Sequence, residues 1–325
     1  MSYLSTAVDF EVPDINKLHL DIYTVGYNEE GESILLLLCD GTKILHSTLT
    51  DCYSEKGYNH IDTILHRRGV KNINAFIWTH PDKDHSVGIP ELLRKYDSTY
   101  EAKIFVPHGI SKKEGLSTES ADSLNYIEKN YNTSRTYKIN YISLNEGEIR
   151  SLLKFKIKVH GEAFVDYSFS FILPNSNVIE RRMNSDEKIL WNDFSIFHIV
   201  TFNNKNFIFG GDLSGQNVQF INEDWMKDTI FVKIPHHGSD TLASFIGKLV
   251  VAGVDNAVCT CTAFKSKRLP HEQILKQYKE FSEGVYCTGN NTTTPHYDYG
   301  CIASVFNANM KDHDIECTGN AYEFR

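Results

Sequence analysis

The chain has 325 residues, 41% of them hydrophobic, and a formal net charge of −9 at pH 7. This acidity argues against a protein that coats duplex nucleic acid, because such proteins gain affinity by neutralising phosphates with basic residues. It does not exclude a nuclease whose metal ions supply the local positive charge. The longest clean apolar run, residues 34–39, is much shorter than the ~20 residues of a membrane helix.

The cysteines indicate the redox compartment of the protein, and the absence of linkers indicates its number of domains. Seven cysteines at irregular spacings are typical of reduced thiols rather than of a disulfide framework. The first residues lack the pattern of a secretory leader, and neither a linker nor a repeat of fixed period is visible. We therefore expect a cytoplasmic protein that does not span a membrane. We expect one domain over residues 1–325, with its core at about 18–290 and returning strands at 285–325.

The first third of the chain alternates between strand and helix patterns. Strands are expected at residues 18–25, 33–39, 43–51 and 74–78, and helices at 60–68 and 88–96. Asp40-Gly41 is a hairpin signal between the second and third of these strands. Gly69 follows the first helix and is expected to end it.

The same alternation continues to the C-terminus and predicts a layered α/β protein. Further strands are expected at residues 103–106, 138–144, 155–159, 169–173, 195–202, 206–209, 229–234, 257–261, 285–287 and 302–306. Further helices are expected at 117–130, 242–250 and 271–281, and a turn at 145–147. Residues 175–190 are polar and are expected to form a loop, a natural place for insertions that shape a substrate site.

Residues 80–85 stand out because they place two histidines and two carboxylates directly after a buried strand. The four side chains are His80, Asp82, Asp84 and His85. Packing does not require such a group at a strand end, whereas shared metal ions do. The plainer interpretation is a polar turn in which Asp84 caps the next helix.

Three more strand ends carry similar groups: Asp51, Asp212 and the pair His236-His237. In sheet-based folds, groups at strand ends converge on one rim where ligands bind. Histidines and carboxylates around an open coordination position suit a hydrolytic metal site. Each of these residues has a plainer interpretation as a turn or loop residue, and only one of the two histidines need bind a metal.

These stretches resemble, in order and spacing, the metallo-β-lactamase superfamily, whose signature is His-x-His-x-Asp-His. Here the signature reads His80-x-Asp82-x-Asp84-His85. This version is more similar to the hydrolase domain of late-competence DNA-uptake proteins (ComEC-like), which carry His-x-Asp-x-Asp-His. Residues 25–34, 192–196, 209–212 and 232–239 also resemble that branch. The resemblance covers about residues 18–290 and implies an α/β fold of the four-layer αββα sandwich type.

The resemblance implies a site for two divalent ions, zinc or manganese, that activates a bridging water. The implied ligands are His80, Asp82, Asp84, His85, Asp212 and one of His236 and His237. Asp84 would also orient the attacking water and Asp212 would bridge both ions, so these two are the implied catalytic residues. Asp51 would hold a ligand histidine in place, and Asn192 would lie beside the site.

The chain departs from the superfamily pattern in two places. Asp82 replaces an imidazole by a harder oxygen ligand, which moves the preference from zinc toward manganese or a mixed site. A matching histidine from the middle of the chain is also missing. His160 and His198 are the candidates, but the competence-like branch has Asn192-x-x-Ser195 in this region. The first metal position is then weak, or empty until substrate arrives.

Several other residues have two interpretations. His271 resembles a site-facing histidine of the competence-like branch with the order of His and Pro reversed, but the preferred interpretation is an ordinary histidine at a helix start. Four histidines are expected to be structural or exposed: His108, His160, His198 and His296. Three basic residues could bind a phosphate near the rim or belong to a solvated loop: Lys265, Lys267 and Arg268.

The expected function is a metal-dependent hydrolase that acts on a phosphodiester, with nucleic acid or a nucleotide as substrate. Its fold alone would leave the substrate open. One alternative is hydrolysis of a small ester, thioester or cyclic nucleotide. Another is a sensor or scaffold with a degenerate metal site. Because the chain lacks the membrane segments of the competence proteins, we expect a free-standing version that belongs to a multi-protein system.

Overall fold

The computed structural model describes residues 8–27, 30–110, 115–131, 141–144, 150–160, 164–185, 189–289, 297–310 and 312–325. Within these ranges the chain forms two large mixed β-sheets and seven α-helices. None of the described helices is both long and apolar enough to cross a membrane. All seven cysteines are free thiols, and six of them are buried.

The first sheet has nine strands in the described residues. In spatial order they are β1 (Val8–Val12), β8 (Arg150–Val159), β9 (Phe164–Phe171), β10 (His198–Phe202), β11 (Lys205–Phe209), β12 (Thr229–Lys233), β13 (Ala257–Cys261), β14 (Ser282–Cys287) and β17 (Tyr322–Phe324). Strands β11, β12, β13 and β14 run parallel to one another. Their C-terminal ends therefore lie at one edge of this sheet.

The second sheet has eight strands in the described residues. In spatial order they are β16 (His313–Gly319), β15 (Tyr299–Asn307), β2 (Leu18–Tyr27), β3 (Glu32–Asp40), β4 (Lys43–Thr50), β5 (Ala75–Ile77), β6 (Lys103–Pro107) and β7 (Tyr141–Leu144). Strands β4, β5 and β6 are parallel, so they too bring their C-terminal ends to one edge.

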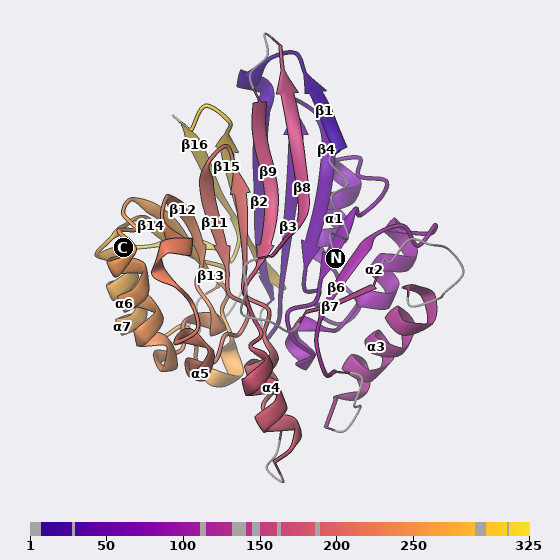
Figure 1. Cartoon of the computed structure of the whole chain (residues 1–325), viewed down its shortest axis with the longest axis vertical. Helices are drawn as coiled ribbons and strands as arrows, with labels where there is room; N and C mark the ends of the chain where they lie inside the picture. Colours follow the sequence, from indigo (N-terminus) through magenta and orange to yellow (C-terminus); the bar gives the residue numbers. More distant parts are fainter. Residues whose placement is uncertain are drawn as a thin grey trace.

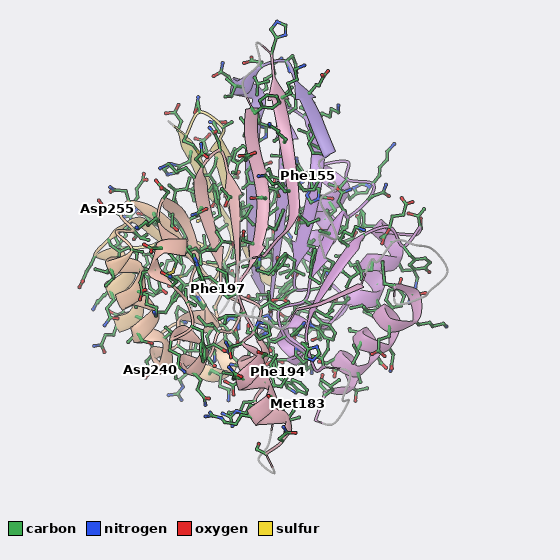
Figure 2. The ribbon with its side chains drawn as sticks, in the orientation of Figure 1. Phe155, Met183, Phe194, Phe197, Asp240 and Asp255 are labelled. Atoms are coloured by element: carbon green, nitrogen blue, oxygen red, sulfur yellow. The ribbon has the colours of Figure 1, made fainter. Side chains whose placement is uncertain are left out.

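The two sheets pack face to face, with helices on both outer sides (Figure 1). One buried cluster joins the facing surfaces and includes Leu36, Phe105, Phe169 and Phe209. Figure 2 labels Phe155 in the same layer, toward the upper end of the long strands. The prediction of a layered α/β protein is confirmed.

Each outer face has its own helical cover and core. Helices α1 (His60–Arg67), α2 (Ile89–Tyr96) and α3 (Thr118–Tyr131) pack on the eight-stranded sheet. Helices α5 (Gly215–Val218), α6 (Ala243–Val251) and α7 (Glu272–Lys279) pack on the nine-stranded sheet. In each long helix the buried side chains recur at helical spacing, which is why these segments form helices rather than strands.

Most predicted elements match the structure within a few residues, but residues 175–190 were wrongly predicted as a loop. They contain α4 (Ser176–Met183), which lies at the lower end of the molecule in Figure 1. Asn175 caps its first turn, and Val178, Ile179 and Arg182 are buried at helical spacing. Two of these three buried residues are apolar, which is too few for the composition of the segment to indicate a helix. Strand β1 was not predicted, whereas β16 and β17 lie within the returning strands expected at 285–325. Residues 138–140 and 145–147 lie outside the described residues.

Candidate metal centre

Residues 80–85 reach the rim through β5 and the turn that follows it. After Ile77 the chain leaves the sheet and forms a single 3₁₀ turn, Lys83–His85. This turn points Asp84 and His85 toward the other sheet. There Asp212 follows β11, and His237 lies in the turn His236–Gly238 after β12. Four side chains from three strand ends thus meet between the two sheets.

These four side chains form a compact buried group whose donor atoms lie within 4.8 Å of one another. His85 Nε2 lies 3.3 Å from Asp84 Oδ2 and 3.5 Å from Asp212 Oδ1. His237 Nε2 lies 3.3 Å from Asp84 Oδ2 and 3.6 Å from Asp212 Oδ2. With bond lengths of about 2.0–2.2 Å, neighbouring donors around a tetrahedral ion are about 3.3–3.6 Å apart. These four distances are therefore compatible with ligands that share one ion, and they are longer than good hydrogen bonds.

Asp51 fixes the orientation of two imidazoles. Its carboxylate accepts a hydrogen bond from His85 Nδ1 at 2.8 Å and another from the Thr79 hydroxyl at 2.6 Å. Because that hydroxyl gives its proton to Asp51, its oxygen can accept from His80 Nδ1, 3.0 Å away. Both histidines then carry their proton on Nδ1, which leaves the Nε2 lone pairs free for a metal. The predicted supporting role of Asp51 has this geometric basis.

His237 is oriented by a longer chain of buried groups. Its Nδ1 lies 2.9 Å from the Thr262 hydroxyl, and that hydroxyl donates to the carboxylate of Glu32. Glu32 also pairs with Lys233 at 2.7 Å. Since the Thr262 hydroxyl donates its hydrogen bond to Glu32, its oxygen accepts a hydrogen bond from His237 Nδ1–H. The Nε2 lone pair of His237 therefore faces Asp84 and Asp212.

The site carries a large excess of buried negative charge. Four buried carboxylates (Glu32, Asp51, Asp84 and Asp212) face a single buried ammonium, that of Lys233. Burial alone would raise the pKa of Asp84 and Asp212, but the adjacent histidines hold both well below the ordinary value. In the same way burial alone would raise the pKa of Glu32, but Lys233 and the two histidines lower it to about 2. Divalent cations are the usual compensation for such a charge.

The histidines respond to the same field in the opposite direction. Burial alone would lower the pKa of His85 and of His237. The carboxylates around them, Asp84 and Asp212 among them, instead raise both values above the ordinary one. Without an ion, the pocket thus attracts protons to its imidazoles, which is a further sign that it favours positive charge.

A second group of potential ligands lies beside the first. The ring centroid of His80 is 4.1 Å from that of His85, and His80 Nε2 is 3.5 Å from Asp82 Oδ2. Among the described residues, four buried atoms here find no hydrogen-bond partner: His80 Nε2, His85 Nε2, Asp212 Oδ1 and His236 Nδ1. Orphaned polar atoms in a core are costly unless something binds them. His80 and Asp82, whose side chain is 39% exposed, thus form a pair of potential ligands beside the four-residue group.

The two consecutive histidines have different surroundings. His237 belongs to the four-residue group, whereas Nε2 of His236 lies 3.2 Å from the side-chain amide of Asn192. Burial is the main reason why the pKa of His236 is lowered, so this ring favours its neutral, metal-binding form. His236 thus lies outside the four-residue group, with the Asn192 amide as its partner.

The backbone around the site is held in unusual conformations. Asp51, His236 and His237 all have φ near +50°, the left-handed region that non-glycine residues rarely adopt. Each such residue costs on the order of 1–3 kcal/mol. Gly211, next to Asp212, has φ +52°, and a Cβ there would lie 2.9 Å from Thr79 Cβ. Strain and close approach concentrate where four chain segments must converge on one point.

Other predicted residues lie elsewhere. His271 is exposed at the start of α7 and makes no side-chain capping bond, although its amide donates to the Gly238 carbonyl at 3.2 Å. His198 is fully buried and stacked on Phe209 in the core. His160 is exposed at the end of β8, and His108 is exposed after β6. His296 lies outside the described residues.

Sequence reasoning missed the supporting groups Glu32, Thr79, Lys233 and Thr262, and gave Ser195 no role of its own. Ser195 accepts a hydrogen bond from the amide of Asp212 at 3.0 Å. The available signal was charge inside apolar strands, since Glu32 opens a run of leucines and Lys233 ends the run Thr229–Lys233. Charged side chains at such positions are buried only when they are paired.

The sequence has no match among known protein-family models. A search of curated proteins also finds no significant match. The chemistry of the site therefore has to be inferred from its own residues.

Proposed function

We propose that this chain is a metal-dependent hydrolase with a dinuclear centre that cleaves phosphodiester bonds, and that its sandwich is of the metallo-β-lactamase type. The observation that carries the proposal is the spacing of Asp84, His85, Asp212 and His237, whose donor atoms lie within 4.8 Å of one another and so could share one ion. The resemblance of residues 80–85 to the ComEC-like motif supports the same conclusion.

The ligand types suit zinc or manganese. Asp84, His85, Asp212 and His237 would hold one ion, and His80, Asp82 and His236 would line the position of the other, with the free oxygen of Asp212 between them. Two divalent ions bound there would lower the pKa of a bound water toward neutrality and polarise a phosphoryl oxygen. The share of carboxylate ligands favours manganese more than an all-histidine site would.

The protein's own residues prepare the site for this chemistry. Asp51, Thr79 and Thr262 keep the protons of three imidazoles on Nδ1, so that the Nε2 atoms face the centre. Asp84, whose side chain is 12% exposed, offers a carboxylate oxygen that can accept a proton from a water on the substrate side. The Asn192 amide, beside His236, is placed to hydrogen-bond an oxygen of the substrate.

The test is hydrolysis by purified protein that has been stripped of metal and reloaded with Mn²⁺ or Zn²⁺. Substrates would be single- and double-stranded nucleic acid, bis(p-nitrophenyl) phosphate and a small thioester. We expect cleavage of the phosphodiesters, and its loss in Asp212→Asn and His85→Ala with the fold retained. Asp97→Asn, which alters a buried carboxylate bonded to the amides of Glu101 and Ala102, is the matched control.

The outcomes separate the alternatives. Hydrolysis of the thioester alone would replace a phosphodiesterase by a small-ester hydrolase. Less than one bound ion per chain, with no turnover of any substrate, would indicate a sensor or scaffold. Wild-type rates in Asp212→Asn would contradict the assignment of the site. A cytoplasmic location, which the unpaired cysteines favour, and membership of a multi-protein system remain predictions.

A further inference from the structure

The segment after β13 concentrates positive charge next to the metal centre. Its residues Phe264, Lys265, Ser266, Lys267 and Arg268, here called the basic loop, form a short turn of three cations in four positions. Phe264 and Leu269 close this turn by exchanging two backbone hydrogen bonds of 3.1 Å. The four residues between them are exposed. The loop is therefore a compact, closed projection rather than a long flexible connection.

The basic loop is fixed to the ligand turn at both of its ends. At its start, the ring centroid of Phe264 is 4.9 Å from that of His237. Thr262, which orients the same histidine, lies only two residues earlier. After its end, Pro270 packs so closely on Gly238 that a Cβ on this glycine would lie 2.7 Å from Pro270 Cβ. The cations of the loop are thus held at a constant place relative to the centre.

The two lysines of this loop are not balanced by carboxylates of the described residues. Lys265 and Lys267 form no ion pair with any described residue. By contrast, Lys248 pairs with Glu223 and Lys276 pairs with Glu272. In a chain of net charge −9, a local group of unpaired cations beside a metal centre concentrates anionic ligands there.

We infer that the basic loop binds phosphates flanking the bond under attack, and that the substrate is therefore a single-stranded nucleic acid rather than a small phosphodiester. This inference rests on the proposed function. Lys265 and Lys267 supply the phosphate contacts, and half-buried Phe264 supplies an aromatic edge for a base. A stacking side chain beside a few cations suits a single strand, because the acidic remainder of the chain disfavours the broad contact that a duplex needs.

The experiment compares the charge reversal Lys265→Glu/Lys267→Glu with the wild type in two assays. The first is kcat/KM for a short oligothymidylate and for bis(p-nitrophenyl) phosphate. The second is binding of a cleavage-resistant phosphorothioate oligothymidylate, followed by fluorescence anisotropy at 50 and 200 mM salt. The matched control is Lys154→Glu/Lys156→Glu, which reverses two exposed lysines at the same spacing on β8.

The charge reversal should lower kcat/KM for the oligothymidylate at least tenfold and leave kcat/KM for bis(p-nitrophenyl) phosphate unchanged. It should also weaken binding of the phosphorothioate oligothymidylate. Each lost contact to a single strand removes about 0.7 from the slope of log affinity against log salt. Two lost contacts make the affinity ratio between 50 and 200 mM salt about sevenfold smaller. The control should behave as the wild type does.

Two results would overturn the inference while leaving the proposed function intact. One is cleavage of both substrates by the wild type with no selective loss in the reversal. The other is an equal loss on both substrates, which would mean that the loop acts through the metal centre. Conversely, lysine-dependent binding without hydrolysis of any substrate would leave the docking role standing and refute the phosphodiesterase.

Discussion

Glu32 and Lys233 form an ion pair of 2.7 Å in which neither side chain has any exposed surface. The two residues come from different sheets, β3 and β12, so the pair joins the sheets beside the candidate metal centre. Removing one partner of a buried pair leaves an uncompensated charge, which costs more than the pair itself contributes.

We therefore expect Glu32→Gln to lower the free energy of unfolding by about 3–5 kcal/mol. The double variant Glu32→Gln/Lys233→Met removes both charges and should recover most of that loss in urea unfolding. It should still bind metal more weakly than the wild type, because the Thr262 hydroxyl loses its carboxylate acceptor and His237 loses its fixed tautomer. Wild-type metal affinity in the double variant would mean that the pair is purely structural.

Asp51→Asn should separate orientation from ligation. The variant keeps the shape of the side chain but weakens the hydrogen bonds that residue 51 accepts from His85 Nδ1 and from the Thr79 hydroxyl. Loss of such a supporting carboxylate typically reduces metal affinity about 10–100-fold. Competition with a chromophoric chelator measures this change. The Asp97→Asn protein serves as control, and an affinity drop of similar size there would show a general effect of lost stability.

Metal removal should destabilise the protein through repulsion among its buried carboxylates. An ion that binds only the folded state adds about 4.1 kcal/mol at a thousand times its Kd. Thermal unfolding should therefore shift upward as Mn²⁺ or Zn²⁺ is added to chelator-treated protein. In Asp212→Asn the metal-dependent shift should shrink, and the metal-free protein should be at least as stable as the wild type. A melting temperature that ignores metal would contradict the site.

Stability should fall in mild acid because of histidines outside the metal centre. Burial lowers the pKa of His198 and of His46 to about 3. The unfolded chain binds protons at these groups near the ordinary pKa, about 6.5, whereas the folded chain does not. Their stabilising effect is complete above that pH and declines toward pH 3.

Each such histidine should lower the free energy of unfolding by about 1.4 kcal/mol per pH unit as the pH falls through this window. The variant His198→Phe, which keeps a ring stacked on Phe209, should remove the contribution of one histidine to the slope of unfolding free energy against pH. Urea unfolding of metal-free protein measures this slope. The exposed His160→Phe variant should keep the wild-type slope. An unchanged slope in His198→Phe would show that this ring is already protonated in the fold.

Strand positions were the most predictable part of the fold, because apolar runs ended by glycine or proline mark them directly. The convergence of Asp51, residues 80–85, Asp212 and His237 was predictable for a related reason. Groups after parallel strands meet at one edge, and the residue types then indicate a metal. The division of labour between His236 and His237 was not predictable, since it depends on the left-handed backbone of the turn that holds them.

The supporting network was beyond sequence reasoning for a physical reason. Thr262 and Glu32 are 230 positions apart and meet only because the two sheets pack face to face. Helix α4 escaped notice because one of its three buried residues is Arg182, which composition counts as polar. Its guanidinium is paired with Asp193 in the interior, and this ion pair offsets the free-energy cost of burying the charge.

The pairing of Arg182 with Asp193 has a consequence for how the protein could change over time. It ties α4 to the turn Trp191–Phe194, which contains Asn192 beside His236, and Figure 2 shows Met183 and Phe194 together at that end. This covering piece attaches through its own side chains and supplies none of the sheet strands. Its sequence can therefore change while the strands that carry the candidate ligands stay as they are.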